Sequence, residues 1–175
     1  TATPCRLDGQ GLGSHSKGYA DKIIIGQKMR WLIDNGYLSE YQYFGIPSEV
    51  DLRNVKTLGG DYKKNELEEI MDKPKITGDA VAHYIRLANG KRAVVFCCSI
   101  KHAEHIVDAF NGVGIKAELL EGNTDLIKRK EVIDRFKAGE TLILCSCDVI
   151  SEGFDLPAIE AAILLRPTQS LSLYL

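Results

Sequence analysis

The feature that most constrains the fold is an alternation of short apolar runs with amphipathic stretches from Lys91 onward. Apolar runs typical of buried strands cover 93–98, 115–120, 141–145 and 161–165. Stretches with apolar residues at helical spacing lie between the first three runs. Strands that alternate with helices of this length predict a parallel sheet with right-handed crossovers. The sequence therefore predicts an α/β fold, a doubly wound three-layer sheet with helices on both faces.

Two helices are predicted in detail within this region. The first ends at Asn111-Gly112, and its inward residues are Ala103, Ile106, Val107 and Phe110. The second begins near Thr124 and ends at Gly139, with Leu126, Val132, Ile133 and Phe136 facing inward. Each would cover part of the sheet.

The part before Lys91 is less regular. Its predicted elements are a mobile glycine-rich loop at 9–18, short strands at 23–25 and 41–46, a helix at 27–35, a charged helix at 63–72 ended by Pro74, and a helix capped by Thr77 that turns Val81, Tyr84, Ile85 and Ala88 inward. The glycine-rich loop has neither a preceding strand nor a following Gly-Lys-Ser/Thr, which a phosphate-binding loop requires.

Composition limits the partners. Lys and Arg number 22 against 24 Asp and Glu, so the formal net charge is −2 and any contact with nucleic acid must be local. The apolar runs are far shorter than the roughly 20 residues that span a bilayer, and the polar start does not resemble a signal peptide. We therefore expect no membrane contact and a cytoplasmic, intracellular location.

Five cysteines are present, at positions 5, 97, 98, 145 and 147. Most lie on or beside predicted strands, where a reduced thiol packs as a small apolar group. The Cys-x-Cys pair has no partner pair at zinc-finger spacing, and the four histidines are scattered. We expect buried thiols and no metal site.

Three hydroxyl residues follow the ends of predicted strands: Ser99, Thr124 and Ser146. The carboxyl ends of parallel strands share one edge of the sheet, where ligands bind. Each hydroxyl is well placed to cap a helix or turn, and each could also contact an anion beside free backbone N–H groups. Together they would line one groove for a nucleic-acid backbone.

The loop from Ser146 to Pro157 has the pattern Ser-x6-Gly-x-Asp-x-Pro, which suits contact with phosphates and a ribose. It resembles the fifth motif of superfamily 2 helicases. Further resemblances to that superfamily are Thr1-Ala2-Thr3-Pro4 (third motif), Val94 to Ile106 (fourth motif), Gly122-Asn123-Thr124 with Arg129 and Phe136 (the segment after it), and Leu165 to Ser170 (the segment after the fifth motif). Gly36-Tyr37-Leu38-Ser39 looks like the repair, restriction and phage branch.

The resemblance implies the second of two RecA-like domains, which together bind ATP and hold a single strand. By position, Ser99, Thr124 and Ser146 would contact the nucleic-acid backbone. Gly153 and Asp155 would face the nucleotide, and Thr1, Thr3 and Glu152 would couple the two domains. The whole protein would use ATP and Mg²⁺, with neither held tightly by this chain, and its partners would be the first RecA-like domain and nucleic acid, DNA more than RNA.

The chain also departs from the superfamily pattern. It has no Gly-x-x-x-x-Gly-Lys-Ser/Thr loop and no Asp-Glu-x-His/Asp sequence, so it lacks the groups that grip the β- and γ-phosphates and magnesium. The sixth motif, with its arginine finger, would begin just after Leu175. We expect residues 1–20 to be the end of a preceding domain or a linker, residues 21–175 to be the second domain cut before the sixth motif, and the chain alone to lack ATPase activity.

Three other interpretations are compatible with parts of this sequence. They are a flavodoxin-like domain that binds a small molecule or nucleotide, a noncatalytic protein-interaction module, and a glycosyltransferase-type second domain. The first explains the sheet but not the 146–157 loop. The second explains the missing phosphate loop. The third requires a sugar-nucleotide carboxylate pattern that the sequence does not contain.

Overall fold

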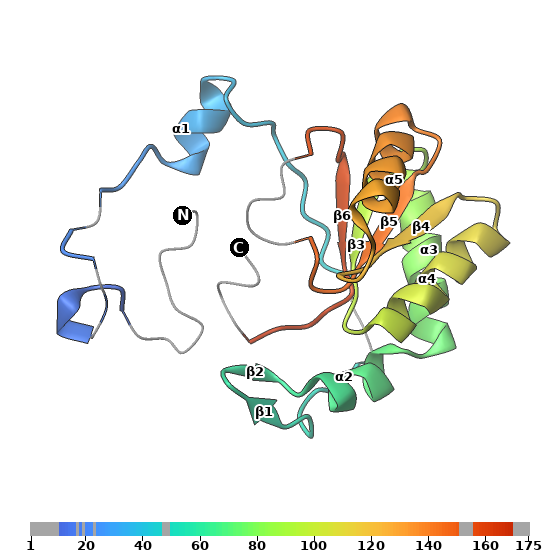
Figure 1. The fold of residues 1–175 in the computed structure, drawn as a ribbon, viewed down its shortest axis with the longest axis horizontal. Coiled ribbons are helices and arrows are strands. Elements are labelled where there is room, and N and C mark those ends of the chain that lie inside the picture. Colours follow the sequence, from blue (N-terminus) through green and yellow to red (C-terminus); the bar gives the residue numbers. More distant parts are fainter. Residues whose placement is uncertain are drawn as a thin grey trace.

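A four-stranded parallel sheet is the core of the part of the chain that follows residue 73 (Figure 1). The structure is a computed structural model that describes residues 11–16, 18, 20–22, 24–46, 50–150 and 156–169. The strands are β3 (Ala93–Phe96), β4 (Ala117–Leu120), β5 (Ile143–Ser146) and β6 (Ala161–Leu164), in the order β4-β5-β3-β6. All neighbouring pairs are parallel. The four predicted strands are therefore confirmed, each slightly shorter than the apolar run that predicted it.

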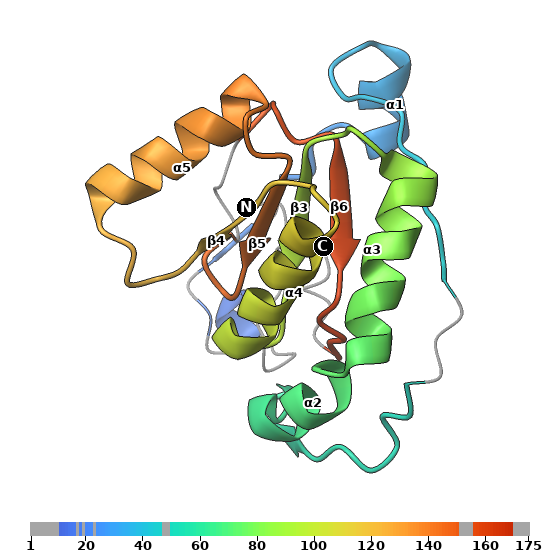
Figure 2. The same cartoon turned by 90° about the vertical axis from the view of Figure 1, so that its right-hand side faces the viewer.

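Helices cover both faces of this sheet. Figure 2 shows α3 (Pro74–Ala88) and α4 (Ile100–Gly112) in front of the strands. Alternate strand residues such as Val95 and Cys145 pack with these two helices, whereas Val94 and Leu144 pack with α5 (Leu126–Ala138) on the other face. Because successive strand residues point to opposite faces, one strand supplies both cores. The expected three-layer α/β fold is confirmed.

The inward face of α5 differs from the prediction at its start. Val132 and Phe136 are buried, and Ile133 packs partly against them, but Leu126 is 82% exposed. Leu126 is the first residue of α5, whereas the residues of α5 that pack on the sheet lie in the second half of the helix. The expected end at Gly139 is confirmed by a left-handed φ of 75° there.

Helix α4 runs through Asn111 to Gly112, and the left-handed residue after it is Gly114.

The helix before β3 starts earlier than expected. Pro74 occupies the first turn of α3, where its missing N–H costs nothing, rather than lying beyond the previous helix as a separate stop. Thr77 is therefore not a cap: it is buried inside α3, and its N–H donates to the carbonyl of Lys73 at 3.1 Å. Val81 and Tyr84 face inward as predicted, and Ala88 packs partly against the core, but Ile85 is exposed.

The remaining described elements lie before α3. They are a short 3-10 helix (Ser14–Ser16), α1 (Met29–Asp34), β1 (Thr57–Leu58), β2 (Asp61–Tyr62) and α2 (Lys64–Met71). Helices α1 and α2 correspond to the predicted helices at 27–35 and 63–72. Strands predicted at 23–25 and 41–46 are wrong where the structure describes them: residues 24–25 and 41–46 are irregular and exposed. No described strand pairs with them, so their aromatic and aliphatic residues have no sheet to join.

Within the described ranges, none of the helices has the length and apolar character needed to cross a membrane.

Candidate ligand edge of the sheet

The carboxyl ends of the four strands are level with one another. Ser146, the last residue of β5, is in register with Phe96 of β3 and Leu120 of β4, and Phe96 is in register with Leu164 of β6. The loops after these strands therefore leave the sheet at one edge. We call this edge, with Ser99, Thr124 and the loops after β5 and β6, the ligand edge, because open parallel sheets bind ligands there.

Ser99 follows β3 at this edge and caps α4. Its backbone is extended, and its Oγ accepts a hydrogen bond from the N–H of His102 at 3.0 Å. This satisfies one of the free N–H groups at the start of the helix. A hydroxyl has one hydrogen to donate besides its lone pairs, so the capping bond leaves the Ser99 O–H free to donate to an anion.

Thr124 does not cap the next helix. The cap of α5 is Asp125, whose carboxylate accepts from the N–H groups of Ile127 and Lys128 at 3.0 Å each. The Oγ1 of Thr124 accepts instead from the N–H of Glu121 at 3.1 Å and so closes the turn between β4 and α5. The expectation of a helix start near Thr124 was right, but the capping side chain is its neighbour.

Ser146 is the most enclosed of the three hydroxyls. It is 1% exposed, and its Oγ accepts from the N–H of Ile150 at 3.2 Å. The hydroxyl thus ties the start of the loop after β5 to a residue further along it. All three predicted hydroxyls lie at the ligand edge, and each holds its own loop; their contact with a nucleic-acid backbone stays a prediction.

The predicted nucleotide residues Gly153 and Asp155 lie outside the described residues, as do Thr1, Thr3 and Glu152. Their assigned roles remain predictions from the sequence.

A network of four charged side chains at this edge was not predicted from the sequence. The Asp148 carboxylate, two residues after Ser146, forms ion pairs with Lys64 of α2 and with Arg166, which follows β6. Arg166 also reaches Asp61 of β2 at 3.5 Å. Nothing in the sequence signals pairings between residues so far apart along the chain.

The conformation and charge of Asp148 both reflect this network. Its φ of 58° is left-handed, and it is the one residue other than glycine in the described ranges with a positive φ. Partial burial by itself would raise the pKa of the Asp148 carboxyl, but the positive charges of Lys64 and Arg166 hold the pKa below its usual value. The carboxylate is therefore ionised at neutral pH.

The four cysteines in the described ranges carry free thiols. Cys97, Cys98 and Cys145 are buried, as expected, whereas Cys147 is half-buried. The Cys98 Sγ lies 3.0 Å from Nδ1 of His102, and burial raises the pKa of this thiol to about 12. Among the described side chains, no group of three or more His, Cys, Asp or Glu residues is arranged to hold a metal ion.

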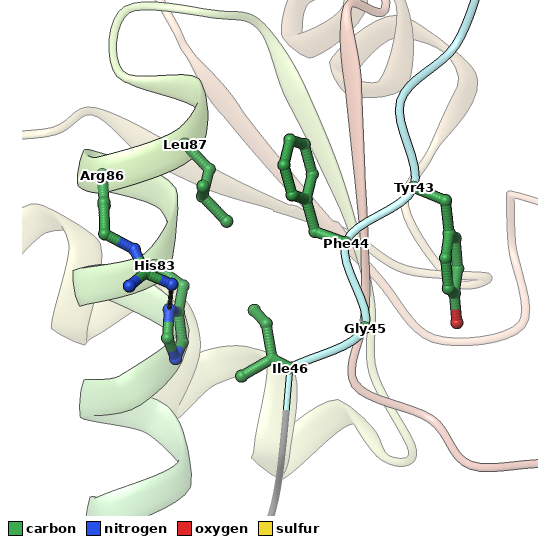
Figure 3. A pocket seen from close by; sticks show the side chains of 7 residues that line it. All are labelled: Tyr43, Phe44, Gly45, Ile46, His83, Arg86 and Leu87. Carbon is green, nitrogen blue, oxygen red and sulfur yellow. Dashed lines mark hydrogen bonds between the residues drawn. The ribbon is translucent and has the colours of Figure 1, made fainter.

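A cavity of about 480 Å³ lies away from the ligand edge (Figure 3). It is lined by Tyr43, Phe44, Gly45, Ile46, His83, Arg86 and Leu87. Phe44 and Ile46 point toward α3, and Tyr43 points away from it. The lining residues of α3 belong to its last turns, next to the start of β3, so this cavity lies toward the opposite end of the strands.

Comparison with known proteins identifies a family match. Residues 72–175 match the model of the helicase conserved C-terminal domain. A 51.5 kDa protein of a Lactococcus phage (isolate 7-9) is 37% identical over 175 residues, which are 100% of this chain and 37% of that protein. The protein IRC3 of Saccharomyces cerevisiae, named as an ATP-dependent helicase, is 30% identical over 156 residues, 87% of this chain and 23% of the yeast protein. The chain thus spans well under half the length of these relatives.

Among solved structures, the Hef helicase domain of Pyrococcus furiosus matches with a TM-score of 0.46 and 22% identity. The match covers 56% of this chain and 20% of that one.

Proposed function

This chain belongs to the helicase conserved C-terminal domain family, and we propose that it is the second motor domain of an ATP-dependent superfamily 2 helicase or translocase. In this role it forms one wall of an ATP cleft and part of a groove for a single nucleic-acid strand. The other wall of the cleft belongs to a first RecA-like domain, which brings the phosphate loop and the magnesium-binding carboxylate that this sequence lacks.

The observation that carries this proposal is the ligand edge itself. Ser99, Thr124 and Ser146 come from three separate segments and lie at the same edge of the sheet, beside the loop that resembles the fifth helicase motif. Hydroxyls and helix N-termini bind phosphate oxygens without reading the bases. The chain has no excess of positive charge, so we expect strand binding by this domain to be weak, salt-dependent and indifferent to sequence.

We propose single-stranded DNA rather than RNA as the preferred strand. The resemblance of Gly36-Tyr37-Leu38-Ser39 to the repair, restriction and phage branch supports this choice. Stimulation of ATP turnover by DNA and RNA strands of equal length and sequence, compared in the whole protein, distinguishes the two.

The nucleotide side of the proposal is tested at Asp155. Asp155→Ala in the whole protein should strongly reduce nucleic-acid-stimulated ATP hydrolysis, because the carboxylate would lose its contact with the nucleotide ribose. The free energy of unfolding should fall by no more than about 1 kcal/mol, the value of one hydrogen bond. Steady-state ATP turnover with and without a single strand, together with thermal unfolding, measures both effects.

Asp108→Ala is the matched control, since Asp108 is an exposed carboxylate on α4. It should leave stimulated turnover unchanged. Wild-type turnover in Asp155→Ala would remove Asp155 from the nucleotide site, and a whole protein without any ATP turnover would remove the motor function altogether.

A further inference from the structure

A small unit formed by β1, β2 and α2 lies beside the ligand edge. In Figure 2 this unit is at the end of the sheet toward which the β6 arrow points. Leu67 and Met71 of α2 are buried in a cluster with Cys98, the second residue after β3, so the unit rests on an apolar base. We call residues 55–71 the edge unit.

We propose that Asp61 and Lys64 of the edge unit, together with Arg166, are positioning residues. They hold Asp148 and thereby fix residues 147–150, the described start of the loop after β5, for coupling strand binding to ATP turnover. The inference rests on the proposed motor function. It adds a role for Asp61 and Lys64, which lie outside every segment that resembles a helicase motif, and for a unit outside the parallel sheet.

The backbone at Asp148 needs such support. Residues other than glycine rarely adopt a left-handed φ, although aspartate and asparagine tolerate it better than most. Asp148 adopts it two residues after the end of β5 and two before Ile150, whose N–H binds Ser146. The turn at Asp148 therefore sets the direction in which residues 148–150 leave the edge of the sheet.

The side chain of Asp148 is held from two directions. Lys64 approaches from the start of α2, and Arg166 approaches from the segment after β6. A carboxylate with two cationic partners on separate elements has a defined position, whereas one with a single flexible partner does not. Loss of either partner would leave the left-handed turn less well defined.

Asp61 completes the arrangement by holding the segment after β6. Its Oδ1 accepts from the N–H of Gln169 at 2.9 Å, and its Oδ2 lies 3.5 Å from Arg166. The side chains of Asp61 and Arg166 are only 16% and 19% exposed, so solvent and salt screen this pair less than a surface pair. Two acids and two bases thus join the edge unit to both loops, and their charges balance.

The experiment uses the whole protein with Lys64→Gln, Asp148→Asn and the double variant. Asparagine keeps the tolerance for a left-handed φ and removes the charge. We expect each single variant to lower the ratio of strand-stimulated to unstimulated ATP turnover by about fivefold, within the usual range of coupling between sites. The double variant should lose no more than the more affected single variant, because both changes break the same contact.

Two controls separate positioning from a general loss of charge or stability. Lys56→Gln removes one positive charge from the same unit and should keep the wild-type ratio. Lys64→Arg keeps the charge and should retain most of the stimulation. Hydrogen exchange at the Ile150 N–H should be faster in Lys64→Gln than in the wild type, with exchange in the middle of α4 unchanged.

The outcomes distinguish this inference from the proposed function. A wild-type protein whose turnover no strand stimulates would overturn both. Normal stimulation in the wild type and an equal ratio in Lys64→Gln, additive losses in the double variant, or unchanged exchange at Ile150 would overturn the positioning role alone.

Discussion

At the scale of single residues, His102 is a buried imidazole within reach of several titratable groups. It is fully buried, its Nδ1 contacts Cys98, and its Nε2 has no hydrogen-bond partner among the described residues. Burial lowers the pKa of His102, an effect that the negative charge of Asp72 opposes and the nearby His105 reinforces. The folded chain therefore keeps this ring neutral at a pH where the unfolded chain protonates it.

This difference predicts a loss of stability in mild acid. Below about pH 6.5 the unfolded state binds a proton that the folded state does not, so the free energy of unfolding falls as the pH drops toward the folded pKa. The slope contributed by one proton is at most about 1.4 kcal/mol per pH unit. Chemical unfolding at pH 7.5 and 5.5 should show a smaller decrease in His102→Leu than in the wild type. His83→Gln serves as the control, and equal decreases in all three proteins would contradict the prediction.

At the scale of elements, α5 shows how the packed face of a helix decides its contribution to stability. Phe136 is fully buried between α5 and the sheet, whereas Leu126 on the same helix is exposed. Phe136→Ala should lower the free energy of unfolding by about 3–5 kcal/mol, because it removes buried apolar area and leaves a cavity. Leu126→Ala should change it by no more than about 0.5 kcal/mol. Urea unfolding measures both, and a large loss in Leu126→Ala would mean that this residue packs inward after all.

At the scale of the whole molecule, the sequence contains only some of the groups that ATP hydrolysis requires. It lacks the loop that grips the β- and γ-phosphates and the carboxylate pair that holds magnesium. We therefore expect the purified 175-residue chain to release no phosphate from ATP, with or without a single strand. Turnover above the buffer rate that disappears when a residue of this chain is substituted would refute this expectation.

Much of the fold was readable from local patterns. Runs such as 93–98 and 161–165 are buried strands because parallel strands covered on both faces need continuous apolar sequence. Gly139 ends α5 because it takes a left-handed φ that other residues avoid. The sequence also placed Ser99, Thr124 and Ser146 at one edge, since topology alone brings the ends of parallel strands together.

Other features depend on contacts that no local pattern records. The 41–46 segment is rich in the aromatic and β-branched residues that strands favour, but a strand also requires a neighbour, and none is present in the described residues. The pairing of Asp61 with Arg166 joins positions that are distant in the sequence, and it belongs to a part of the molecule where α2 packs on Cys98. Leu126 is exposed because it begins α5, and only the second half of this helix packs on the sheet.

The strand order has a consequence for how the protein is made. β5 lies between β3 and β4, yet it leaves the ribosome after both of them, and β6 emerges later still on the other side of β3. β3 and β4 therefore have no sheet partner while β5 is being synthesised, although both carry apolar side chains on their two faces. Non-local pairing of this kind slows folding and prolongs the exposure of strands that are prone to aggregate. Recombinant yield should therefore improve at reduced growth temperature or with chaperones that shield nascent chains.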